Sequence, residues 1–334
     1  MAVEHTTRSV RITDVAALAG VSIGTASKAL NDTGQLREET RRRVKDAAEK
    51  LGFVGDARAR ALSSGRTFTV GMITTDSFGR FTMPVLLGAE DALSAGEMMV
   101  LVGDTRDDHV REAHYLRSLV ARGVDGIVVT GRSADARLSI EVPLPVPVVY
   151  ALTPSTDPSD VSITLDDAAG AAAAATHLLG LGRRRIAVVT GPEEARSAVE
   201  RARGAAVALG DRMVGAPVHG EWSERWGRQA VDLLDRSSSA VDAVLCGNDQ
   251  IARGVCDRLR ETGRSVPDDV AVTGYDDWDV VALASRPPLT TVDMRLDELG
   301  RIAGRALLEL VAGGRPASTA VTPSLVVRES TVGA

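Results

Sequence analysis

The chain has 334 residues, of which 44% are hydrophobic and 25% are charged, so its composition is that of a globular protein with two or three compact units. The net charge of −6 would by itself argue against nucleic-acid binding. The charge is unevenly spread, however: residues 1–66 carry 12 Lys and Arg against 8 Asp and Glu, whereas residues 67–334 carry 27 against 37. Positive charge therefore gathers in the N-terminal part, where it could meet phosphate groups.

The sequence lacks the signals of several protein classes. Residues 1–7 are polar with no apolar signal-peptide segment after them, and no run of 18 apolar residues exists. We therefore expect a cytoplasmic protein without a membrane partner. The two cysteines and five scattered histidines offer no metal-binding spacing. No G-x-G-x-x-G follows the first strands and no histidine adjoins a G-x-S-x-G, so we expect no metal, no cofactor and no enzymatic activity.

Residues 12–31 predict two short helices joined by a tight turn. Thr13 can cap the first helix, Gly20 can end it, and Ser22 can cap a second helix from about Ile23 to Leu30. Small and apolar residues at helical spacing supply the contact between the two helices. Such a helix-turn-helix places its second helix in the major groove of DNA. The alternative is an ordinary helical hairpin inside a core.

A third helix is predicted from about Glu38 to Leu51, followed by a linker at residues 63–66. From Phe68 the pattern changes to short apolar strands between amphipathic helices, which indicates parallel sheets covered on both faces. A second cycle begins at Asp166, and two lobes suggest a ligand cleft at the strand carboxyl ends. The last long helix, about 296–312, is expected to return to the first lobe. The strands are expected at 68–73, 98–102, 126–129, 146–150, 186–190, 243–246 and 270–275.

Six further motifs follow the helix-turn-helix in order. They are Val-Asp-Gly-Ile-Val-Val (124–129), Leu-Gly-Arg-Arg-Arg-Ile-Ala (181–187), Glu-Arg-Ala-Arg-Gly (200–204), Gly-Asn-Asp-Gln-Ile-Ala-Arg-Gly (247–254), Val-Pro-Asp-Asp-Val-Ala-Val-Thr-Gly-Tyr-Asp-Asp (266–277) and Arg-Pro-Pro-Leu-Thr-Thr-Val (286–292). With them the chain resembles the LacI/GalR family of bacterial transcription regulators over nearly its whole length. The resemblance implies a dimer on a palindromic DNA operator and a small effector that changes DNA affinity.

The expected fold follows from the pattern and the resemblance together. Residues 1–66 should form an all-α helix-turn-helix headpiece with a hinge helix at about 56–63. Residues 67–334 should form a two-lobed α/β core of doubly wound parallel sheets, similar to periplasmic sugar-binding proteins. The first lobe is expected at about 67–164 and 294–322, and the second at about 165–293 and 323–334. No leucine heptad follows the last strand, so a homodimer is expected rather than a tetramer.

The resemblance places Ile23, Gly24 and Lys28 at positions that read base edges in the family. Lys28 could donate to guanine, with a phosphate contact as the alternative. Ile23 offers only apolar contact and Gly24 has no side chain, so we predict few direct hydrogen bonds to bases and more readout of DNA shape. The positions that contact phosphates in the family are occupied by Ser22, Thr25, Ser27, Asn31 and Arg37. For Ser22 and Ser27, a helix cap and a surface hydroxyl are the alternatives.

Two residues of the expected hinge helix complete the DNA set. Leu62 matches the leucine that the family wedges into the minor groove at the operator centre, which kinks the duplex. The alternative is a hydrophobic contact between paired hinge helices. Ser63 is a candidate hydrogen-bond donor in the same groove.

The effector cleft is expected to bind hydroxyl groups. Arg201 and Asp276 match positions that the family uses for effector hydroxyls, and a structural ion pair is the alternative for Arg201. Asn248 adds an amide, and Trp222 an aromatic face that can stack on a sugar ring. The other residues expected to border the cleft are Asp76, Phe81, Tyr150 and Trp278, of which Tyr150 and Trp278 could instead pack in the hinge between the lobes.

These residues predict a repressor of carbohydrate-related genes whose operator affinity is controlled by a sugar or oligosaccharide. One alternative is a corepressor-type regulator that senses a purine or another metabolite. The other is a solute-binding protein without a regulatory role.

Overall fold

The computed structural model describes residues 10–53, 66–94, 98–140, 142–236 and 240–333. The chain divides into two compact units, residues 1–67 and 68–334. The expected hinge helix at about 56–63, with Leu62 and Ser63, lies outside the described residues. None of the helices described is both long and apolar enough to span a membrane.

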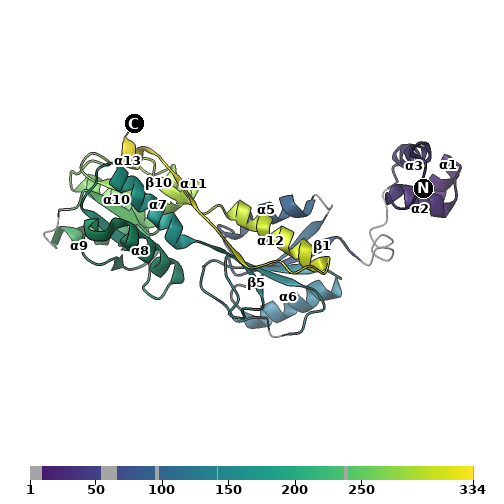
Figure 1. Ribbon diagram of the computed structural model, residues 1–334, viewed down its shortest axis with the longest axis horizontal. Coiled ribbons are helices and arrows are strands. Elements are labelled where there is room, and N and C mark those ends of the chain that lie inside the picture. The colour runs from purple at the N-terminus through teal and green to yellow at the C-terminus, as the bar shows by residue number, and fades with distance from the viewer. Residues whose placement is uncertain (1–9, 54–65, 95–97, 141, 237–239, 334) are drawn as a thin grey trace, which may run out of the picture. The chain divides into compact units, whose positions relative to one another are not determined.

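The N-terminal unit is a bundle of three helices, drawn in purple in Figure 1. They are α1 (Ile12–Ala19), α2 (Ile23–Leu30) and α3 (Glu38–Leu51). Each helix contributes a small, fully buried side chain to a common core, namely Val15, Ala26 and Val44. Because the buried side chains are small, three short helices can pack closely enough to exclude water.

The helix ends follow the local sequence with one exception. Ser22 Oγ accepts the N–H of Thr25 (3.1 Å), as expected of a helix N-cap. The predicted cap at Thr13 is wrong, because α1 begins at Ile12 and Arg11 precedes it. The Asp14 carboxylate accepts the N–H of Arg11 (2.8 Å), so the side-chain hydrogen bond at the start of α1 comes from Asp14 and not from a threonine hydroxyl.

The larger unit contains two six-stranded sheets, one in each lobe, as the alternation of strands and helices predicted. The first lobe holds β1 (Thr69–Thr74), β2 (Met99–Asp104), β3 (Gly126–Thr130), β4 (Val148–Ala151), β5 (Val161–Leu165) and β11 (Thr319–Val321). The second holds β6 (Ile186–Thr190), β7 (Val218–His219), β8 (Ala243–Cys246), β9 (Ala271–Asp276), β10 (Thr290–Asp293) and β12 (Ser324–Val326). The strand orders are β11-β5-β4-β3-β1-β2 and β12-β10-β9-β8-β6-β7, and the pairing is parallel except between β10 and β12.

Helices cover both faces of each sheet. The first lobe carries α5 (Thr82–Ser94), α6 (His109–Ala121) and α12 (Leu296–Val311). The second carries α7 (Asp167–Gly180), α8 (Arg196–Leu209), the 3-10 turn Gly210–Arg212, α9 (Glu224–Arg236), α10 (Asp249–Glu261), α11 (Asp279–Ala282) and α13 (Glu329–Val332). Alternate residues of β1 face opposite layers: Met72 packs in the core with α5 and α12, and Ile73 in the core with α6.

The chain passes between the lobes three times. The passages lie between β5 and α7, between β10 and α12, and between β11 and β12. Figure 1 shows the last passage as the yellow segment that returns from the first lobe to the second. Helix α12 packs along α5, which confirms that the last long helix returns to the first lobe. Three adjacent connections make a hinge, on which two lobes can open and close.

Pairs of glycines bring two pairs of helices into backbone contact. A Cβ on Gly88 of α5 would lie 1.8 Å from the carbonyl oxygen of Asp297, and a Cβ on Gly300 of α12 would lie 2.1 Å from that of Val85. In the second lobe, Gly227 of α9 and Gly254 of α10 face each other's backbone in the same way. Only glycine allows such an approach, so these positions fix how the helix layers pack.

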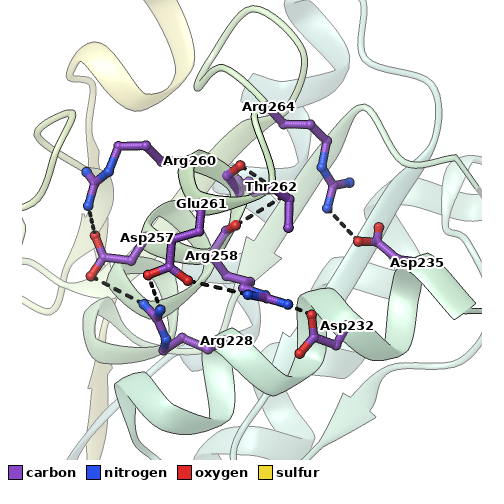
Figure 2. Close-up of polar contacts among 10 residues, drawn as sticks. Arg228, Asp232, Asp235, Asp257, Arg258, Arg260, Glu261, Thr262 and Arg264 are labelled. Atoms are coloured by element: carbon purple, nitrogen blue, oxygen red, sulfur yellow. Dashed lines mark hydrogen bonds and ion pairs between the residues drawn. The ribbon is translucent and has the colours of Figure 1, made fainter.

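The helices α9 and α10 also share a network of ion pairs at the surface, shown in Figure 2. Arg258 lies at its centre: Nε contacts Asp232 (2.8 Å) and Nη1 contacts Glu261 (3.4 Å), and Glu261 also pairs with Arg228. The other pairs of the network are Arg228 with Asp257 (3.8 Å), Arg260 with Asp257 (2.7 Å) and Arg264 with Asp235 (2.8 Å). Most of these side chains are substantially exposed, so the network contributes little to the stability of the protein.

Gly88→Ala should lower the free energy of unfolding of the larger unit by about 1–3 kcal/mol, because its methyl group would force α5 and α12 apart. The matched control is Gly180→Ala at the end of α7, where an added Cβ meets nothing within 4 Å, and stability there should hold or rise slightly. Urea denaturation followed by far-UV circular dichroism measures both. Equal losses in the two variants would show that the glycine contact does not set the helix packing.

Candidate functional site

Helix α2 presents an exposed surface built from the residues expected to contact bases. Ile23, Gly24 and Lys28 are its first, second and sixth residues, and all three are exposed, Ile23 to 53%. Gly24 and Lys28 are four residues apart, so they lie on the same face of the helix. A Cβ on Gly24 would meet only Ser22 Oγ, at 3.9 Å. The absence of a side chain at this position is therefore not required by packing within the unit.

The other expected DNA contacts surround this face. Ser22, Asn31 and Arg37 are exposed, and Thr25 and Ser27 are half-buried. Asn31 Nδ2 donates to Ser27 Oγ (3.4 Å), and Arg37 precedes α3 as an N-cap whose side chain makes no capping bond.

Asp32 fixes the turn between α2 and α3. Its carboxylate pairs with Lys45 (3.0 Å) and Arg41 (2.8 Å). Hydrogen bonds from Lys45 and then from Arg41 lower the pKa of the Asp32 carboxyl. Arg41 is thus engaged within the unit, and its side chain is only 16% exposed.

A cavity of about 160 Å³ lies between the two lobes, at the carboxyl ends of their strands. Five of the residues expected at the effector cleft line it: Phe81, Arg201, Trp222, Asn248 and Asp276. The described residues that line this cavity do not include Asp76, Tyr150 or Trp278. The structure therefore brings together most of the predicted set, from segments that lie up to about 200 residues apart in sequence.

The guanidinium of Arg201 is the buried centre of this cavity. Its Nε donates to Asp167 (2.7 Å), and its Nη1 donates to the carbonyl oxygen of Gly247 (2.7 Å) and to Asp276 (3.4 Å). Its Cζ atom lies 3.6 Å from the centre of the Tyr275 ring. Burial opposes the charge, but Asp167, Tyr275 and Asp276 outweigh it and raise the pKa of Arg201, which keeps the group cationic.

Asp276 joins the two lobes through Arg80, a residue that the sequence did not indicate. Arg80 Nη2 pairs with Asp276 Oδ2, and its guanidinium lies 4.4 Å from the Trp278 ring and 4.9 Å from the Phe81 ring. Asp276 has φ of 110°, a strained backbone conformation for a residue with a side chain, and such strain clusters at binding sites. No spacing signal could have found Arg80, because 196 residues separate it from Asp276.

Three predicted residues have structural partners of their own. The Asp76 carboxylate accepts the N–H groups of Phe81 (2.8 Å) and Thr82 (3.0 Å), where α5 begins. Tyr150 is 1% exposed and its hydroxyl accepts the N–H of Ile140 (2.9 Å), within the first lobe. Asn248 caps α10 with its side-chain oxygen, and its amide still borders the cavity.

A second buried carboxyl, Asp249, lies behind Asp276. It accepts the N–H of Trp278 (2.8 Å) and the hydroxyl of Thr291 (2.5 Å). Burial, and then the charge of Asp276, raise the pKa of Asp249 to about 8, against its hydrogen bonds and Arg80. Among the described residues, no group of three or more His, Cys, Asp and Glu could hold a metal ion. The arrangement is suited to hydrogen bonding with several hydroxyl groups at once.

Comparison with known proteins agrees with this geometry. Residues 11–56 match the family described as "Bacterial regulatory proteins, lacI family", and residues 175–331 match "Periplasmic binding protein-like domain". The chain is 34% identical to the HTH-type transcriptional regulator CelR of Thermobifida fusca, over 95% of this chain and 96% of CelR. It is 32% identical to the HTH-type transcriptional repressor PurR of Aliivibrio fischeri (strain MJ11), over 90% of this chain and 91% of PurR.

Solved structures share the fold over nearly the whole chain. A complex of the transcriptional regulator CelR with cellobiose is 31% identical, with a TM-score of 0.64, covering 96% of this chain and 99% of that one. A lac repressor dimer bound to operator and the anti-inducer ONPF is 25% identical, with a TM-score of 0.73, covering 97% of this chain and 99% of that one.

Gly24→Ala should stabilise the N-terminal unit by about 0.5–1 kcal/mol, because alanine is the better helix former and the site has room for a methyl group. Thermal unfolding of the full-length protein, followed by far-UV circular dichroism, measures the shift in the unfolding transition of residues 1–67. Gly34→Ala is the control, since φ of 68° and the nearby Lys28 side chain should make alanine unfavourable there. A loss of stability in Gly24→Ala would contradict the open surface described for α2.

Asp249→Asn should change how stability depends on pH. The folded pKa of Asp249 lies above that of an unfolded carboxyl, so the wild type should lose stability as pH rises from about 4 towards 8. From pH 5 to pH 8 we expect the variant to gain at least ~1 kcal/mol relative to the wild type, since one pKa unit corresponds to about that free energy. Urea denaturation at each pH measures it, with the exposed Asp211→Asn as control. Parallel curves for all three proteins would refute the raised pKa.

Proposed function

Since the chain belongs to the lacI family of bacterial regulatory proteins, it is a DNA-binding transcription regulator and not an enzyme, and we propose that a sugar controls its operator affinity. The observation that carries the proposal is the buried pair of Arg201 and Asp276, whose charged groups border one cavity between the lobes. A guanidinium donates and a carboxylate accepts, so together they bind adjacent sugar hydroxyls with charge-assisted hydrogen bonds.

The rest of the cavity suits the same class of ligand. Trp222 and Phe81 offer aromatic faces for the apolar side of a sugar ring, and Asn248 offers an amide that can donate and accept. The similarity to CelR, whose structure is a cellobiose complex, supports a sugar effector and a role in carbohydrate-related genes.

A purine corepressor is the second candidate. The same aromatic faces can stack on a flat base, and PurR is similar to this chain over 90% of its length. Purines therefore belong in any ligand panel beside sugars.

The protein acts on DNA as a homodimer in this proposal. Four exposed apolar side chains support a self-association surface on the first lobe: Met83 and Leu87 on α5, and Met99 and Val102 on β2, each about half exposed or more. A two-fold dimer presents two headpieces to a palindromic operator, which the protein meets in the cytoplasm. The lac repressor dimer on its operator is the corresponding arrangement in a relative.

The proposed DNA contacts follow from the exposed face of α2. Lys28 donates to a base edge or a phosphate, and Ile23 contacts a thymine methyl. Leu62, outside the described residues, is proposed to wedge into the minor groove with Ser63 beside it. Ser22, Thr25, Ser27, Asn31 and Arg37 are proposed to contact phosphates.

Effector binding is proposed to act on the contact between the lobes. Arg80 of the first lobe holds Asp276 of the second, so a ligand that bonds to Asp276 competes with an interaction that joins the lobes. The ligand shifts operator affinity only by its difference in affinity for the two lobe arrangements. Repression with release by the sugar is the behaviour we propose.

Arg201→Ala should still bind operator but lose the response to sugar. The operator is first selected from random duplexes by the wild type, and affinity is then measured by fluorescence anisotropy against sugars, sugar phosphates and purines. We expect one sugar to weaken wild-type binding by at least roughly fivefold, the lower end of typical coupling. Arg203→Ala, which removes an exposed arginine of the same helix, should respond like the wild type. A response retained in Arg201→Ala would refute the site, and a response to purines alone would favour the second candidate.

A further inference from the structure

The side chain of Arg80 lies inside the effector cleft, among the residues that line the cavity between the lobes. It comes from the loop between β1 and α5 of the first lobe and contacts the second lobe. Its Nη2 donates to Asp276 Oδ2, and the side chain is only 16% exposed. Arg201 Nη1 donates to the other oxygen of the same carboxylate at 3.4 Å. Both oxygens that sugar hydroxyls would bind are therefore already engaged by guanidinium groups.

Arg80 also covers an aromatic ring that was expected to border the cleft. Its Cζ atom lies 4.4 Å from the centre of the Trp278 ring, within the range of a cation–π contact. Trp278 is half-buried, and the described residues that line the cavity do not include it. Asp249 accepts the backbone N–H of Trp278 (2.8 Å), which fixes the backbone that carries the ring. Arg80 thus separates a well-anchored aromatic face from the cavity.

The cavity is small for an effector while Arg80 holds this position. Its volume is about 160 Å³. Pockets that hold whole organic ligands usually measure about 300–1,000 Å³. A different rotamer of Arg80 would enlarge the cavity and add the Trp278 ring to its wall. A ligand that binds at Asp276 therefore gains both volume and a stacking surface when Arg80 moves away.

The backbone on either side of Arg80 is anchored, so rotation of the side chain is the motion that such a ligand requires. The Asp76 carboxylate accepts the N–H groups of Phe81 (2.8 Å) and Thr82 (3.0 Å). The N–H of Gly79 donates to the carbonyl oxygen of Asp76 (3.1 Å). These bonds hold the residues before and after Arg80 to one another, whereas its long side chain has several rotamers available.

The charges of the cleft favour a neutral sugar. The described lining residues carry equal numbers of cations and carboxylates, namely Arg80, Arg132, Arg201, Asp135, Asp167 and Asp276. A neutral sugar leaves this balance unchanged, and its hydroxyl groups can donate to Asp276 in place of Arg80. An anionic sugar would instead retain Arg80 as its own partner.

We propose that Arg80 competes with the effector for one place in the cleft, between Asp276 and the Trp278 ring. A neutral sugar displaces the guanidinium, its hydroxyl groups take over the hydrogen bonding at Asp276, and the apolar face of a sugar ring stacks on Trp278. Arg80 thereby lowers the affinity for sugar. This inference rests on the proposed sugar response and deepens it, because it gives Trp278 a place in the effector site and Arg80 a role in setting affinity.

Titration calorimetry of the full-length protein with glucose, galactose, mannose, xylose, cellobiose, maltose and lactose tests the competition. In Arg80→Ala, the Kd of the sugar that binds should fall at least roughly fivefold, because no hydrogen bond to a charged group has to be broken first. Adding Trp278→Ala to Arg80→Ala should then weaken binding at least roughly threefold, because the stacking face is lost. Arg111→Ala is the matched control, since it removes an exposed arginine of the same lobe that lies 3.8 Å from Asp108. It should bind sugar like the wild type.

A second measurement reports the cover on Trp278 without any sugar. Trp222→Phe and Trp226→Phe together leave Trp278 as the only tryptophan of the chain. Acrylamide quenching of its fluorescence then measures how freely the ring is reached. Arg80→Ala in this background should raise the quenching constant, whereas Arg111→Ala should leave it unchanged.

Weaker sugar binding in Arg80→Ala would show that Arg80 holds the sugar directly, which overturns the competition and leaves the proposed sugar response standing. An unchanged Kd in Arg80→Ala, or quenching that does not change, would overturn the competition as well. If none of the seven sugars binds to the wild type or to Arg80→Ala while operator binding persists, the proposed sugar response fails, and the competition with it.

Discussion

The buried guanidinium of Arg201 is the interaction on which the arrangement of the cleft depends. Its hydrogen bonds reach Asp167 at the start of α7, the carbonyl of Gly247 after β8, and Asp276 at the end of β9. One side chain thereby connects three segments at the mouth of the second lobe. Removal of the Arg201 charge would leave the buried carboxylates of Asp167 and Asp276 without a compensating cation. The ion pairs therefore hold these three side chains together.

The same cluster explains why the site can respond to a ligand. Asp276 is shared between Arg201 within the second lobe and Arg80 from the first. Asp249 behind it has its pKa raised by burial and by this neighbour. A buried carboxylate such as Asp276 is stabilised by additional hydrogen-bond donors, and the hydroxyl groups of a sugar are such donors. In the proposed mechanism, ligand binding and contact between the lobes therefore involve the same carboxylate of Asp276.

Helices and strands were predicted well where capping or helix-ending residues stand at the end of a periodic run of apolar residues, or where a short apolar run stands alone. Helices α2 and α3 have the expected bounds because Ser22 caps one and glycine ends the other, and β6 and β8 because each is a short apolar run. Other elements depend on distant partners: β10, β11 and β12 are short strands whose order follows from the passages between lobes. The register of such strands is set by the sheet they join, which a local window does not contain.

The site was predicted in part for the same reason. Resemblance placed Arg201, Asp276 and Trp222, and residue chemistry and expected position added Asn248 and Phe81. The structure brings all five to one cavity. The roles of Asp76 and Tyr150 could not be read from sequence, because a carboxylate at the start of α5 and a tyrosine at a strand end suit either a structural bond or a ligand. Arg80 is recognised as a partner of Asp276 only when segments distant in sequence are placed side by side.

The most direct test of the account is the affinity of the full-length protein for its sugar, measured by calorimetry with and without a saturating operator duplex. Coupling between two sites is reciprocal, so operator must change sugar affinity by the factor by which sugar changes operator affinity. We predict that bound operator weakens sugar binding at least roughly fivefold, by the same factor in both directions. Equal sugar affinity in the presence and absence of operator would contradict the claim that the cleft controls DNA binding.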